Sequence, residues 1–274
     1  MYPPAHGGEL SLLLIIVVLG WTLIHTTFCT GFFEAWCLCV AHAVHRDAGR
    51  TLQSEEPRSA QAQSNTMEFR EINKVDGGDF QDAVKIYVEA FPGNERHPVD
   101  IISERVRQGA NKLYVASLND EIAFLALLWP LKNTNFILLD YMATKNVHRG
   151  KGIASAFLTT LRESLLNTEK HLVLEVENPN FDDRTQEKEK RVAFYKHKGA
   201  RVLEDVRYLL PPLSGNNPTE MILMIFPEYK TEAISGPTVK NLILQIYREL
   251  YNRESDDALL GTFVHDIGDT IRLI

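Results

Sequence analysis

The sequence is poor in cysteine. It has three cysteines in 274 residues, and all of them, Cys29, Cys37 and Cys39, stand close to the N-terminus. The chain after them has no thiol, which excludes disulfide bridges and a cysteine nucleophile from that part. A long domain without cysteine is typical of a reducing compartment.

Basic residues are too few for a general nucleic-acid-binding protein. The chain has 29 Lys and Arg residues against 36 Asp and Glu residues, a formal net charge of −7. Proteins that bind nucleic acid through its backbone concentrate positive charge instead. The composition therefore predicts no nucleic-acid partner, and its mild acidity is compatible with a cationic one.

Formal charge is absent from residues 10–33. This stretch is long enough for a membrane-spanning helix, which needs about 20 residues. Arg46 and Arg50 follow it and no Lys or Arg precedes it, so the positive-inside rule predicts a cytoplasmic location for the rest of the chain. Two interpretations stay open: a single-pass membrane anchor, or an upstream extension from a misassigned start codon, since Met67 directly precedes the first strand pattern.

Metal-binding patterns are weak. The Cys-x-Cys-x2-His-x2-His run at 37–45 does not have the spacing of a structural zinc site. The pair His265-Asp266 has no His or Asp partner at usable spacing. We therefore predict that the protein uses no metal.

Alternating and amphipathic patterns predict strands interrupted by helices. The expected strands are 68–72, 112–118, 122–131, 136–143, 172–177, 201–210 and 221–226. The expected helices are 80–91 (with Asp79 as its N-cap), 99–107, 154–166, 191–198 and 239–252, and a charged loop fills 178–189. Meander strands before a strand–helix–strand unit predict a mixed α/β sheet.

The domain boundaries follow from composition. Residues 1–50 form the hydrophobic segment, and 51–66 are polar and free of aromatic residues, as in a flexible linker. The α/β patterns fill 67–230, and a helical extension follows at 231–274.

Residues 148–155, His-Arg-Gly-Lys-Gly-Ile-Ala-Ser, are the most informative stretch. They connect a strand pattern to a helix pattern through a glycine-rich turn. Gly150 and Gly152 let the backbone approach a ligand closely, and the free amides at a helix start suit a phosphate. Arg149 and Lys151 add positive charge. We expect a cofactor with a pyrophosphate to bind at this turn.

Two common phosphate-binding loops do not fit this turn. A Walker loop requires Ser or Thr after Lys151, and a dinucleotide fingerprint requires glycine where Ser155 stands. The pattern Arg/Gln-x-x-Gly-x-Gly/Ala does fit, at Arg149, Gly152 and Ala154. It resembles the acetyl-CoA pyrophosphate loop of the GNAT superfamily of N-acetyltransferases.

Two further segments are similar to the same family. Residues 191–200, with Phe194-Tyr195 and Gly199, resemble its later helix, and Leu172–Glu177 resembles its central strand. The resemblance covers about residues 68–228. It implies the acyl-CoA N-acyltransferase (GNAT) fold, with a mixed α/β sheet.

The resemblance also implies acetyl-CoA as co-substrate. By this resemblance, the backbone at Met142 and Thr144 pairs with the pantetheine arm. The amides that hold the pyrophosphate are then those of Arg149, Gly150, Lys151, Gly152, Ile153 and Ala154.

The catalytic candidates come from the similar helix and strand. Tyr195 matches the family tyrosine, and a phenol with an ordinary pKa of about 10 stays protonated and can donate to a departing thiolate. Glu175 is the candidate base. Glu177 lies on the same strand face, and two close carboxylates raise each other's proton affinity. Asp140, in the preceding strand, is the alternative base.

Some positions depart from the family pattern. Lys188 stands where the family often has Asn, seven residues before the tyrosine, and Ala200 follows Gly199 in place of Phe. The stretch 178–189 has the length of an insertion. Asn178 or Asn180 is expected to take the role of the missing Asn.

The sequence therefore predicts an N-acetyltransferase that moves an acetyl group from acetyl-CoA to a primary amine by direct attack in a ternary complex. The acceptor is a small-molecule or peptide amine. The alternative is a non-catalytic acyl-CoA-binding or sensing module, tethered to a membrane through 10–33. The sequence leaves the acyl chain preference and the oligomeric state open.

Overall fold

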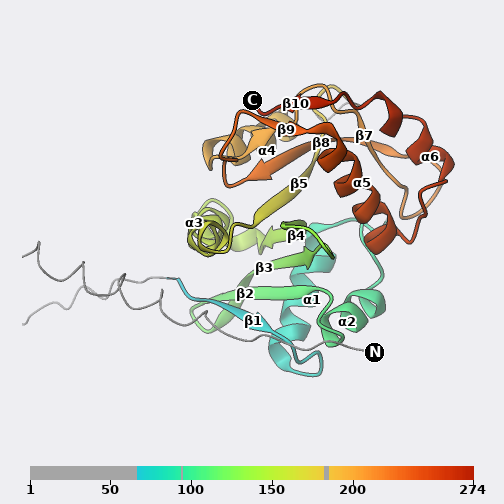
Figure 1. Ribbon diagram of the computed structural model, residues 1–274. Helices are drawn as coiled ribbons and strands as arrows, with labels where there is room; N and C mark the ends of the chain where they lie inside the picture. Colours follow the sequence, from blue (N-terminus) through green and yellow to red (C-terminus); the bar gives the residue numbers. More distant parts are fainter. Residues whose placement is uncertain (1–66, 94, 182–184) are drawn as a thin grey trace, which may run out of the picture. The chain divides into compact units, whose positions relative to one another are not determined.

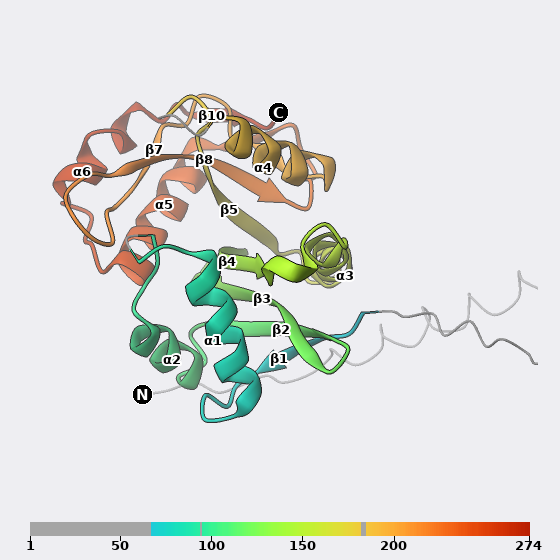
Figure 2. The same cartoon turned by 180° about the vertical axis from the view of Figure 1, so that it is seen from behind.

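A mixed sheet of eight strands organises the domain. The computed structural model describes residues 67–93, 95–181 and 185–274, which Figures 1 and 2 show from opposite sides. The strands are β1 (Phe69–Ile72), β2 (Lys112–Leu118), β3 (Glu121–Pro130), β4 (Phe136–Thr144), β5 (His171–Glu177), β6 (Arg201–Val202), β7 (Tyr208–Leu210) and β8 (Thr219–Phe226). Their order is β1-β2-β3-β4-β5-β8-β6, and β7 also pairs with β8.

Helices connect and cover these strands. They are α1 (Gly78–Ala90), α2 (Val99–Arg107), α3 (Ile153–Asn167), α4 (Thr185–His197), α5 (Gly236–Tyr251) and α6 (Ala258–Gly261), with 3-10 turns η1 (Asn146–His148) and η2 (Val264–Asp266). Strands β9 (Ala233–Ser235) and β10 (Thr270–Arg272) form a separate antiparallel pair.

The strand directions confirm the mixed sheet. Strands β1 to β4 form an antiparallel meander, and β4 pairs with β5 in parallel through the crossover helix α3. Strand β8 then returns antiparallel to β5. Parallel neighbours need such a crossover, because a tight turn reverses the chain direction and so joins only antiparallel strands.

The two faces of the sheet carry different helices. On one face, α3 and α4 pack against Leu174 and Val176 of β5. On the other face, α1 and α2 cover β2 to β4, and α5 packs over β5, β7 and β8. Strand alternation explains the division, because Val173 and Glu175 point away from Leu174.

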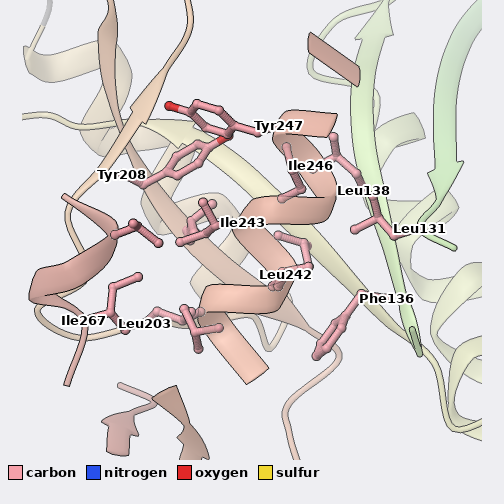
Figure 3. Close-up of a cluster of buried hydrophobic side chains, with 14 of the residues drawn as sticks. Leu131, Phe136, Leu138, Leu203, Tyr208, Leu242, Ile243, Ile246, Tyr247 and Ile267 are labelled. Atoms are coloured by element: carbon pink, nitrogen blue, oxygen red, sulfur yellow. The ribbon is translucent and has the colours of Figure 1, made fainter. Parts of the chain in front are cut away.

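The C-terminal helix α5 is part of this core. Its buried residues include Leu242, Ile243 and Ile246, which follow helical spacing. Figure 3 shows them among side chains of other elements, such as Tyr208 and Leu138. The predicted helical extension 231–274 therefore packs into the domain core, and it also contains the strands β9 and β10.

Three local predictions were wrong. Asp79 does not cap α1: the N-cap is Gly77, no side chain caps the helix, and Asp79 instead pairs with Arg70 at 2.7 Å. The predicted strand 201–210 is two short strands, β6 and β7, because the chain turns between them with Asp205 at φ 58°. The predicted loop 178–189 includes the first residues of α4.

The predicted anchor 10–33, the linker 51–66 and the Cys/His run 37–45 lie outside the described residues. Within residues 67–93, 95–181 and 185–274, no helix combines the length and the apolar character needed to cross a membrane.

Gly236, the first residue of α5, leaves no space for a side chain. An added Cβ would lie 1.8 Å from the backbone oxygen of Gly268. We expect Gly236→Ala to lower the free energy of unfolding by about 2–4 kcal/mol, because the backbone on both sides must shift. Urea unfolding measures the change.

The matched control is Gly78→Ala at the first residue of α1. No atom lies within 4 Å of its added Cβ. Its stability should stay within about 0.5 kcal/mol of wild type. Equal stability of the two variants would show that the contact between Gly236 and Gly268 is not tight.

Candidate active site

The candidate site begins where β4 and β5 stop pairing. Their parallel register ends at Leu139 and Leu174, although β4 continues to Thr144 and β5 to Glu177. A register shift opposite Leu127 and Leu128 leaves Asp140 without a partner on β3. Within the described part of the chain, the facing edges of the two strands are therefore unpaired beyond Leu139 and Leu174 and are free for a ligand.

The glycine turn follows β4 after the short 3-10 turn η1. Gly150 has φ 77° and Gly152 has φ 78°, the left-handed conformation that favours glycine. No described atom lies within 4 Å of a Cβ added at either position, so the turn faces open space. A side chain at either glycine would strain the turn and project into this space.

Several backbone amides at this turn have no hydrogen-bond acceptor among the described residues. The first amide with a helical partner is that of Ala156, which donates to the Gly152 oxygen at 2.9 Å. No acceptor within the described residues takes the amides of Gly150, Lys151, Gly152, Ile153, Ala154 and Ser155. With no acidic residue in the first turn of α3, this helix start is suited to an anion.

Two cationic side chains hold the turn. The Nε of Arg149 donates to the backbone oxygen of Thr144 at 3.3 Å. The Nζ of Lys151 lies 3.1 Å from Nδ1 of the buried His148, whose Nε2 is 3.5 Å from Glu121. Both cations therefore stay beside the free amides and strengthen the positive potential there.

Glu175 of β5 is held by two tyrosines. Its Oε1 accepts a hydrogen bond from the hydroxyl of Tyr208, and its Oε2 accepts one from Tyr251 at 3.1 Å. Burial raises the pKa of Glu175 to about 7, with a smaller contribution from the charge of Asp140, while the two tyrosine hydrogen bonds oppose the rise. The carboxyl group can therefore gain or lose a proton near neutral pH.

Asp140 is a second buried acid, and its charge acts on Glu175. Burial raises its pKa to about 6, against the charge of Arg105 and a 3.2 Å hydrogen bond from Nδ2 of Asn111. The prediction that Glu177 acts on Glu175 was wrong. Glu177 pairs with Arg191 of α4, and Asp140 is the acid whose charge raises the Glu175 pKa.

Tyr195 approaches the sheet from the opposite face. It is a buried residue of α4 and packs with Leu174 and Val176, whereas Glu175 points toward α5. Burial raises the pKa of Tyr195 to about 12, with the charge of Arg191 opposing the rise. The hydroxyl is therefore protonated at neutral pH.

The loop before α4 is built differently from the expectation. Asn178 is already engaged, since its Nδ2 donates to Glu220 at 2.6 Å and its Oδ1 accepts from the amide of Asn180. Lys188 is buried and donates to the backbone oxygen of Phe181. The Asn178 side chain is therefore engaged within this loop, and the role expected of Asn178 or Asn180 stays a prediction.

Sequence reasoning missed three residues that surround the acids Glu175 and Asp140: Tyr208, Tyr251 and His97. The imidazole of His97 stacks on Tyr251 at 6.2 Å, and burial lowers its pKa to about 4. A neutral imidazole adds no positive charge beside the acids. The available signal was the spacing of Tyr247 and Tyr251, four residues apart on one helix face.

A separate cavity of about 610 Å³ lies at the other end of the strands. Phe136, Leu165, His171 and Tyr229 are among its lining residues, and none of the predicted site residues lines it. Within the described residues, no group of three or more His, Cys, Asp or Glu side chains is arranged to hold a metal ion.

Known proteins match the region just described. Residues 80–197 match the acetyltransferase (GNAT) family. This segment belongs to the GNAT acetyltransferase family. This segment is therefore similar to acetyl-CoA-dependent acetyltransferases, a family whose members acetylate amine acceptors. No curated protein matches the chain.

Several solved structures are similar to this chain, and the first of those below shows the same fold. A Bacteroides thetaiotaomicron protein of the GNAT family has 22% identity and a TM-score of 0.58, over 68% of this chain and 99% of that one. A GNAT acetyltransferase from Elizabethkingia anophelis with acetyl-CoA bound has 16% identity and a TM-score of 0.41, over 59% and 97%. The ribosomal-protein-S18-alanine N-acetyltransferase from Escherichia coli has 14% identity and a TM-score of 0.44, over 60% and 96%.

The raised pKa of Glu175 predicts a pH-dependent stability. The pKa of Glu175 in the folded protein, about 7, exceeds its ordinary value of 4.5. The contribution of this carboxyl group to the stability of the folded state is therefore complete below about pH 4.5 and is lost as the pH rises through about 7. We expect Glu175→Gln to be more stable than wild type by about 2 kcal/mol at pH 8, a figure reduced for partial exposure, and by little at pH 4.5. Urea unfolding across this range measures it.

The control is Glu177→Gln on the same strand, which removes a carboxylate paired with Arg191. It should keep the pH dependence of the wild type. A stability difference between Glu175→Gln and wild type that stays constant from pH 4.5 to pH 8 would contradict the environment described for Glu175.

Proposed function

We propose that this chain transfers an acetyl group from acetyl-CoA to a primary amine by direct attack in a ternary complex. One observation carries the proposal: the unpaired edge of β4 leads, through the 3-10 turn η1, to the free amides that begin α3. A cofactor with an extended, amide-containing arm next to a diphosphate matches this order, because the arm can pair with the strand edge and the diphosphate can bind the amides. The acceptor is a small-molecule or peptide amine.

The residues fit the cofactor part by part. The amides of the Arg149–Ala154 turn would hold the diphosphate, and backbone groups of Met142 and Thr144 would pair with the pantetheine arm. When bound, acetyl-CoA supplies the activated acyl group as a thioester. No atom of the described residues lies within 4 Å of a Cβ added at Gly150 or Gly152, which supports this placement.

Glu175 is proposed as the base. An amine acceptor arrives as an ammonium ion and must lose a proton before it attacks. The pKa of about 7 lets the carboxylate accept that proton at neutral pH, and the pKa of about 4 at His97 keeps the imidazole neutral, so it does not repel a cation. Asp140 stays the alternative base because it belongs to the same cluster.

Tyr195 is proposed as the acid. Its pKa of about 12 keeps its proton in place until the thiolate departs, and its position on the α4 side of the sheet separates it from Glu175. Acid and base then act on opposite sides of the unpaired strand ends. Such a division suits a reaction in which one proton leaves the nucleophile and another reaches the leaving group.

Tyr195→Phe tests the proposal. We expect the variant to lower kcat by about 100-fold, because general acid catalysis is lost, while its Kd for coenzyme A stays within about twofold of wild type. Release of free thiol in the presence of an amine panel measures kcat, and calorimetry measures Kd. The control Tyr229→Phe removes a hydroxyl beside His171, away from the site.

Wild-type turnover in Tyr195→Phe would end the assignment of the acid. Binding of coenzyme A by the wild type without any thiol release across the panel would favour the non-catalytic acyl-CoA-binding module instead.

A further inference from the structure

The C-terminal helix α5 reaches the proposed base. It lies outside the family match at residues 80–197, yet its last residue, Tyr251, donates a hydrogen bond to Oε2 of Glu175. One turn earlier, the hydroxyl of Tyr247 donates to the backbone oxygen of Leu209 in β7. Since β7 also carries Tyr208, the same helix is tied to both donors of the Glu175 carboxylate.

Tyr208 is held firmly from several sides. It is fully buried, and its ring packs edge-on against Tyr247 at 6.1 Å and against Phe263 at 6.0 Å. Figure 3 shows Tyr208 and Tyr247 side by side at one end of this core cluster. The direction of the Tyr208 hydroxyl toward Glu175 is therefore fixed by packing.

Tyr251 is fixed by the anchoring of α5. Glu249 accepts hydrogen bonds from Nε1 of Trp129 and from the amide of Lys132, both at 2.9 Å. Nη2 of Arg105 donates to the backbone oxygen of Leu250 at 2.8 Å. These contacts hold the end of α5 against β3 and α2, and His97 stacks on the Tyr251 ring from the other side.

We infer that Tyr208 and Tyr251 are positioning residues, which hold the two oxygens of the Glu175 carboxylate so that it faces the unpaired ends of β4 and β5. The inference rests on the proposed role of Glu175 as base. We call the two hydrogen bonds from Tyr208 and Tyr251 the clamp. Each carboxylate oxygen keeps a second lone pair, so the clamp leaves Glu175 able to accept a proton. The C-terminal segment then belongs to the catalytic machinery as well as to the core.

The clamp has a signature that a purely structural role lacks. Asp140 of β4, Tyr208 of β7, and Tyr247 and Tyr251 of α5 are the titratable groups that surround Glu175. Hydrogen bonds to the charged form lower a carboxyl pKa, so removing either donor should raise the pKa of Glu175. The acid limb of kcat/KM reports this value in the free enzyme.

The experiment measures kcat/KM against pH for wild type, Tyr251→Phe and Tyr208→Phe. We expect the midpoint of the acid limb to rise by about one pH unit in each variant. Tyr251 lies at the helix end and is partly exposed, so Tyr251→Phe can still test the inference if Tyr208→Phe does not fold. Tyr247→Phe is the matched control: it loses a buried hydroxyl on the same helix and should be less stable, with the midpoint unchanged.

Three outcomes would overturn the inference. Profiles of Tyr251→Phe and Tyr208→Phe that overlay wild type, with Glu175→Gln inactive, would leave Glu175 as base without a clamp. A shift in Tyr247→Phe as large as in Tyr251→Phe would assign the effect to loosening of α5. Full activity in Glu175→Gln would refute the role of Glu175 as base, and with it this inference, whereas the proposed acetyl transfer would stand with Asp140 as the base.

Discussion

The site depends on one interruption of backbone pairing, the end of the parallel register between β4 and β5 after Leu139 and Leu174. Backbone amides and carbonyls normally find partners in the sheet, so an unpaired edge inside a domain requires another partner or solvent. Here the edge of β4 leads into the turn that starts α3, where further amides lack acceptors among the described residues. Beside this interruption, Glu175 points to one face of the sheet and Tyr195 packs on the other.

Burial then sets the chemistry of the side chains near this gap. The sheet and α5 remove water from Glu175 and Asp140, which raises both pKa values toward neutrality. Tyrosine hydroxyls and the charge of Arg105 limit the rise. Burying two acids close together lowers the stability of the fold. Such arrangements concentrate at functional sites, because they bring the pKa of a proton acceptor close to the working pH.

The sequence predicted what is local. The glycine turn at 148–155 and most strand bounds follow from short patterns, and Glu175 and Tyr195 came from the family resemblance. Sequence could not show the clamp, because Tyr208 and Tyr251 are 33 and 76 positions from Glu175 and meet it only through tertiary packing. The start of α4 was missed because 185–190 is charged and lacks an apolar period.

The central claim is that the turn at Gly150–Gly152 holds the diphosphate of coenzyme A. Its most direct test is calorimetry of coenzyme A binding to Gly152→Ala and Gly109→Ala. The two glycines have similar φ values, 78° and 72°, and equally open surroundings, so backbone strain is matched. The account predicts a Kd at least about tenfold weaker for Gly152→Ala alone. Wild-type affinity in Gly152→Ala, or equal weakening in both variants, would contradict it.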